Sequence, residues 1–166
     1  MKLWYSFILI FSAACSYFLP SSPRSISARQ EKHYQVTFSH PDWKNVKSYE
    51  SDYLFQHHKS GDILMVNSFC REFQTESLKK LAHRSFRDVE QVRIIEEKEI
   101  SFHQRSAYRI KGEGKVDGVL VSLNLLNLRR DHCYFDFLSI SSKKKNSGSE
   151  ADFENFLSSV RFSDEK

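Results

Sequence analysis

The side chains best able to do chemistry are scattered along this sequence and do not form a catalytic motif. His57 and His58 are adjacent, and His132 directly precedes Cys133. Neighbouring residues of a strand point to opposite faces, so neither pair can easily hold one metal ion. The chain contains no Gly-x-Ser-x-Gly element, and its five glycines form no phosphate-binding loop. We therefore predict no metal site, no cofactor and no catalytic centre.

One carboxylate stands out by its surroundings. Asp136 interrupts an otherwise apolar run, Tyr134-Phe135-Asp136-Phe137-Leu138. A buried carboxylate needs a partner, or its pKa rises. Arg109 is the expected structural partner, and a role of Asp136 in binding is the alternative. Asn67 and Asn124 raise the same question more weakly.

The N-terminal segment predicts export. Lys2 precedes an almost wholly apolar run at residues 3–11, which is followed by Ser12-Ala13-Ala14 and Cys15. The run is shorter than the roughly 20 residues that a membrane-crossing helix needs, so residues 1–14 are predicted to be a signal peptide. Residues 12–15 resemble a bacterial lipobox, from which Ser12 departs. The resemblance implies that Cys15 carries fatty acyl chains such as palmitate, which anchor the protein to a membrane. Cleavage after Ala14 without lipid, which gives a soluble secreted or periplasmic protein, is the alternative.

The other two cysteines are predicted to be structural. The chain has three cysteines, and if Cys15 carries lipid, Cys70 and Cys133 are the two that remain. An even remainder in an oxidising compartment favours a disulfide, with two buried free thiols as the alternative. The pair is not a Cys-x-x-Cys motif, so a structural role is favoured over catalysis.

Composition indicates one globular domain behind a tether. The chain has 166 residues, of which 40% are hydrophobic and 28% charged. The net charge is +4, with acids and bases interspersed and the Lys143–Lys145 run placed in a loop, which argues against a nucleic-acid surface. Residues 15–32 are rich in Ser, Pro and charge, which is typical of a flexible tether, and the domain is expected at 33–163.

Hydrophobic periodicity predicts seven strands and two helices in that domain. The strands are expected at 34–38, 53–57, 63–69, 92–100, 106–111, 119–128 and 133–140, with connecting turns at 111–114 and 130–132. One helix is expected after Thr75 and a second after Ser149. The runs at 119–128 and 133–140 are apolar on both faces. The prediction is an α+β fold, a mostly antiparallel sheet of about six or seven strands with a helix on each face.

This order of elements resembles a group of uncharacterised bacterial envelope lipoproteins with a PsbP-like α/β/α sandwich fold. The resemblance spans about residues 33–162 and includes Ser51-Asp52-Tyr53, Asp117-Gly118-Val119 and Cys133-Tyr134-Phe135-Asp136-Phe137. It implies a fold and carries over no catalytic or binding residue. The expected function is a non-catalytic protein-binding or stabilising module of the cell envelope. Its expected partners are a membrane, through the lipid anchor, and an unknown envelope protein. A carrier of a small apolar ligand and an enzyme of unidentified class are the alternatives.

Overall fold

The computed structural model describes residues 34–70, 76–130, 132–142 and 150–163. The predicted signal peptide, Cys15, the tether, Thr75, Ser149 and the Lys143–Lys145 run lie outside these ranges. The described elements are, in chain order, β1 Tyr34–Val36, β2 Trp43–Asn45, β3 Tyr53–His57, β4 Ile63–Cys70, α1 Leu78–Ser85, β5 Glu90–Phe102, β6 Arg105–Val116, β7 Val119–Arg130, β8 Cys133–Ser142, α2 Glu150–Ser158 and β9 Val160–Phe162.

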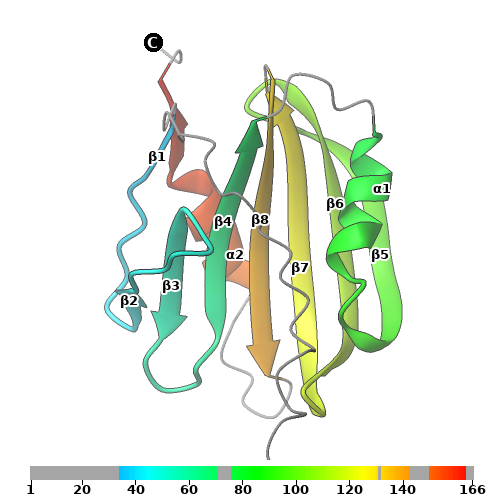
Figure 1. The fold of residues 1–166 in the computed structure, drawn as a ribbon. Helices are drawn as coiled ribbons and strands as arrows, with labels where there is room; N and C mark the ends of the chain where they lie inside the picture. The colour runs from blue at the N-terminus through cyan, green and yellow to red at the C-terminus, as the bar shows by residue number, and fades with distance from the viewer. Residues whose placement is uncertain (1–33, 71–75, 131, 143–149, 164–166) are drawn as a thin grey trace, which may run out of the picture.

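Seven strands form one antiparallel sheet in the order β2-β3-β4-β8-β7-β6-β5. The two strands whose sequences are apolar on both faces, β7 and β8, lie in its centre, where both faces can be covered. Figure 1 shows α1 in front of this sheet and α2 behind it. The predicted sheet with a helix on each face is therefore confirmed.

The core on the α2 side is rich in phenylalanine. Phe153, Phe156 and Leu157 of α2 are buried against Phe135 and Phe137 of β8. The ring centroids of Phe137 and Phe156 are 6.3 Å apart, within the range of favourable aromatic pairs. These contacts explain why the helix predicted after residue 149 packs where it does.

A second, two-stranded sheet completes this side. β1 pairs with β9, with Tyr34 opposite Phe162 and Val36 opposite Val160. The strand predicted at 34–38 therefore exists but does not join the main sheet. Tyr34 is buried in the α2-side core, and its hydroxyl donates to Asp52 Oδ2 at 2.6 Å.

α1 covers the other face with a smaller core. Ser77 is its N-cap, with a side chain that accepts a hydrogen bond from the backbone N–H of Lys80. Ala82 of α1 and Phe86, which follows the helix, pack on Ile110 of β6.

The turn predicted at 111–114 is wrong, because these residues continue β6. Two glycines are used there for close packing and not for chain reversal. A Cβ added to Gly112 would lie 2.9 Å from Phe86 Cε1, and one added to Gly114 would lie 2.4 Å from Val89 Cγ1. The actual reversal is Asp117-Gly118, where both residues have positive φ.

The disulfide expected between Cys70 and Cys133 is present. The two residues are direct cross-strand partners of β4 and β8, with their Cα atoms 4.1 Å apart. The bridge therefore joins two central strands that are 63 residues apart in sequence.

Within the described residues, no helix is both long and apolar enough to cross a membrane.

Candidate functional site

The α1 side of the sheet is covered over only part of its width by the described helices. α1 contacts β6 and β7, which leaves the same face of β3, β4 and β8 without a described helix over it. Two cross-strand rows of side chains lie on this part of the face. One row is Leu54, Met65 and Leu138, and the other is Gln56, Ile63 and Ile140.

We call the five apolar residues of these rows the open half-face, namely Leu54, Ile63, Met65, Leu138 and Ile140. All five are half-buried, and Leu138 and Ile140 also touch the α1-side core. Further along β4 on the same face, the side chain of Phe69 is 48% exposed. Apolar residues in register on neighbouring strands form a contiguous surface, which is the kind of surface that marks interaction sites.

A polar row borders the open half-face. Asn67 of β4, Asp136 of β8 and Asn127 of β7 are cross-strand partners across the three central strands. Asn127 is only 1% exposed, and its Nδ2 donates a hydrogen bond to Asp136 Oδ1. Its own Oδ1 is buried and has no hydrogen-bond partner among the described residues. Two oxygen acceptors are thus placed together at the edge of an apolar surface.

Burial dominates the electrostatics of Asp136. Desolvation raises the pKa of its carboxyl to about 6, and the hydrogen bond from Asn127 only partly opposes this. In the described part of the chain, no ion pair joins Asp136 to a lysine, arginine or histidine. Asp136 is therefore ionised at neutral pH without a described counter-ion.

The predicted partnership of Asp136 with Arg109 is wrong. Arg109 lies on the α2 side of the sheet, where its Nη1 is 2.5 Å from Glu154 Oε1 and its Nε donates to Asn124 Oδ1 at 3.2 Å. Asp136 points to the α1 side, because its strand neighbours Phe135 and Phe137 face α2. The two charged side chains are therefore separated by the sheet.

Asn67 lies beside Asp136 in register but bonds elsewhere. With its amide oriented to satisfy its neighbours, Asn67 Nδ2 donates to the Glu50 carbonyl at 3.1 Å and to the Val66 carbonyl at 3.2 Å. Its amide therefore holds the segment before β3 against β4. Asn127 is the partner that sequence reasoning missed, although it interrupts an apolar strand just as Asp136 does.

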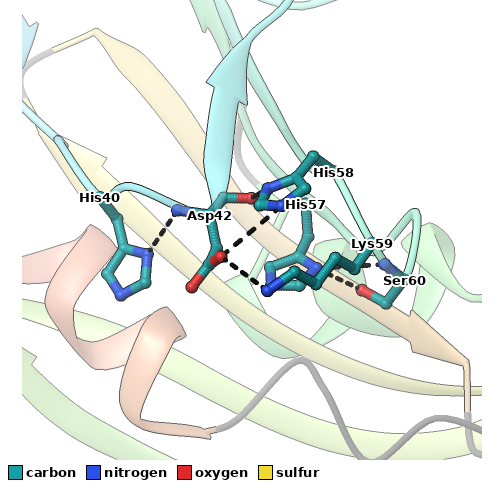
Figure 2. Close-up of polar contacts among 6 residues, drawn as sticks. All are labelled: His40, Asp42, His57, His58, Lys59 and Ser60. Carbon is teal, nitrogen blue, oxygen red and sulfur yellow. Dashed lines mark hydrogen bonds and ion pairs between the residues drawn. The ribbon is translucent and has the colours of Figure 1, made fainter.

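A second polar cluster lies at the β2–β3 edge (Figure 2). The Asp42 carbonyl accepts hydrogen bonds from the backbone N–H of His58 at 2.9 Å and from His58 Nδ1 at 2.8 Å. The Asp42 carboxylate is 3.4 Å from Lys59 Nζ and 3.7 Å from His58 Nε2. Partial desolvation raises the pKa of Asp42, but the Lys59 ammonium, with smaller effects of His58 and His40, holds it below its usual value.

The two neighbouring histidines of this cluster differ in burial. His57 is buried against the Trp43 ring, while its neighbour His58 is exposed. His57 Nδ1 lies 2.8 Å from Ser60 Oγ and also accepts the Ser60 backbone N–H at 3.2 Å. This is a serine–histidine contact that sequence reasoning missed.

A nucleophile–base pair also needs a third group that orients the base. The Asp42 carboxylate bonds Lys59 and lies beside His58 instead of His57. Within the described residues, no group of three His, Cys, Asp or Glu side chains could hold a metal ion. We therefore interpret these contacts as stabilising the β3–β4 turn. The Asp136 region is the candidate site.

Comparison with known proteins identifies the fold. No family model matches the chain, and no curated protein sequence matches it. LpqN of Mycobacterium tuberculosis, described as involved in cell envelope biogenesis, superposes with a TM-score of 0.59 at 6% identity over 76% of this chain and 81% of LpqN. A Bacteroides thetaiotaomicron protein superposes with a TM-score of 0.56 at 11% identity over 78% of this chain, which spans 45% of that protein.

A further similar structure is the cyanobacterial PsbP protein, CyanoP, of Synechocystis. It superposes with a TM-score of 0.53 at 9% identity over 78% of this chain and 86% of CyanoP. Identities this low show a shared fold and nothing about shared residues in a site. The fold of this chain is therefore an α/β/α sandwich similar to that of PsbP.

Proposed function

We propose that this protein is an exported, lipid-anchored module of the cell envelope that binds a protein partner through the open half-face and catalyses no reaction. The observation that carries the proposal is the apolar, in-register surface of β3, β4 and β8, over which no described helix lies. A sheet face of this kind is normally covered, either within the domain or by a partner.

The compartment is supported by two independent features. The disulfide between Cys70 and Cys133 is of a kind that persists in oxidising compartments and is rare in the cytosol. The sequence Ser12-Ala13-Ala14-Cys15 supports lipid attachment at Cys15. The likeness to LpqN, a protein of envelope biogenesis, agrees with this location.

The anchor is tested with Cys15→Ser in the native host. We expect the wild-type protein to fractionate with membranes and to carry acyl chains on Cys15 by intact mass, and the variant to be released or to remain unprocessed. If the wild-type protein starts at an unmodified Cys15 and is free of membranes, the lipid-anchor proposal is wrong and the soluble secreted alternative is favoured.

The docking surface is tested with a photoreactive amino acid at Met65, inside the open half-face. A matched position is Leu120, which is 43% exposed at the distant β6–β7 hairpin on the α2 side. We expect a reproducible protein adduct from position 65 in intact cells and none from position 120. Equal labelling at both positions would show that the surface has no preferred partner. A co-purified small apolar molecule in native mass spectrometry, lost in Met65→Glu, would support the ligand-carrier alternative instead.

A further inference from the structure

The groups around Asp136 leave its negative charge without compensation in the described fold. Asn67 and Asn127 are uncharged, and Tyr134 and Leu138 flank Asp136 on its own strand. Arg129 lies two residues after Asn127 on β7, but its guanidinium lies 4.6 Å from the Tyr134 ring centroid and donates to the Glu76 carbonyl.

Asp136 is half-buried, and its carboxyl is desolvated enough to raise its pKa. A charge that is partly removed from water in a stable protein is normally paired, because desolvation disfavours the charged form. Asp136 is ionised at neutral pH, since its pKa is about 6. The Asp136 carboxylate accepts a hydrogen bond from the uncharged Asn127 amide, and no described cation pairs with it. A cation from outside the described fold would compensate its charge.

We propose that the Asp136 carboxylate, oriented by Asn127, receives the side chain of a lysine or arginine from the protein partner that docks on the open half-face. This inference rests on the proposed function. A lysine or arginine has an apolar stem and a charged end, which matches an apolar row followed by a carboxylate. The stem would cross Met65 and Leu138, and the charged end would reach Asp136 in the next row.

The extent of the surface argues for a protein segment over a free amine. The open half-face spans β3, β4 and β8, about 10 Å across at the usual strand spacing. The exposed Phe69 extends it along β4. A broad, open and apolar surface suits a helix or strand of a partner, whereas small molecules occupy enclosed pockets.

The test compares two isosteric changes that each remove one negative charge. Asp136→Asn removes the proposed acceptor charge, and Asp117→Asn removes an exposed one at the β6–β7 turn. Each is combined with the photoreactive residue at Met65. We expect Asp136→Asn to reduce the adduct roughly tenfold or more and Asp117→Asn to leave it unchanged.

The partner's residue is then identified from the cross-linked peptide. Replacing the lysine or arginine of that peptide by glutamine should cause the same loss, with no further loss in the Asp136→Asn background. In the purified complex, carbon-13 NMR of the Asp136 carboxyl should show a pKa lower than that of the free protein.

The outcomes separate this inference from the proposed function. A strong adduct from position 65 that Asp136→Asn does not change would overturn the inference and leave the docking surface standing. No adduct from position 65 would overturn both. Arg71, outside the described residues, provides the control for an internal counter-ion. If Arg71→Gln raises the pKa of Asp136 in the free protein, the cation comes from this chain and the inference is wrong.

Discussion

Asp136→Asn is expected to stabilise the isolated domain at neutral pH. The carboxyl has a pKa of about 6 in the folded protein against an ordinary value of 3.8. A difference of about 2 pKa units corresponds to roughly 3 kcal/mol, at 1.36 kcal/mol per unit. Because the pKa of Asp136 is higher in the folded than in the unfolded protein, ionisation of Asp136 lowers the free energy of unfolding. This loss is absent below about pH 4, grows as the pH rises to about 6, and is complete above about pH 6.

The assay is urea unfolding of the wild type and the variant at pH 4 and pH 7, with the disulfide intact. An asparagine at position 136 can still accept the hydrogen bond from Asn127, so the free energy of unfolding of the variant at pH 4 should be close to that of the wild type. At pH 7 it should be about 2–3 kcal/mol more stable than the wild type. Asp117→Asn, at an exposed turn, should show no such pH dependence. A stability difference that is the same at both pH values would refute the assignment of an unpaired buried charge.

Three further changes test the fold. Replacing both Cys70 and Cys133 by serine should lower the free energy of unfolding by up to about 4 kcal/mol, since the bridge closes a 63-residue separation, and a reducing agent should abolish the difference between variant and wild type. Gly114→Ala should destabilise by about 2 kcal/mol or more in thermal unfolding, because the new Cβ would lie 2.4 Å from Val89 Cγ1. Gly118→Ala has open space around the new Cβ but a φ of +75°, so it should cost only about 1 kcal/mol, and an equal loss at both glycines would contradict the packing argument.

The layered architecture could be predicted from the sequence because its central strands carry a strong signal. The runs that became β7 and β8 are apolar on both faces, and this pattern is typical of a sheet covered on both sides. The pairing of β1 with β9 could not be predicted. Each has three residues, and they meet across almost the whole length of the described chain. Short strands with distant partners leave too little pattern to recognise.

The candidate site was predicted in part. Asp136 stood out because a carboxylate in an apolar strand is unusual, and it is half-buried with a raised pKa. The prediction that Arg109 pairs with Asp136 was wrong because side-chain direction alternates along each strand, and the sequence does not show the register between β6 and β8. Arg109 and Asp136 consequently lie on opposite faces. The same ambiguity affected Gly112 and Gly114, since glycine serves both turns and close packing.

The pairing of β1 with β9 also determines how the domain can be held. Any pull transmitted along the chain from its N-terminal side enters at Tyr34, which is buried on the α2 side and bonded to Asp52. The three paired residues of β1 share that tension with β9, which directly follows α2. The open half-face lies on the opposite face of the sheet from β1 and β9. A force applied to the chain before Tyr34 would therefore act first on the phenylalanine-rich core on the α2 side.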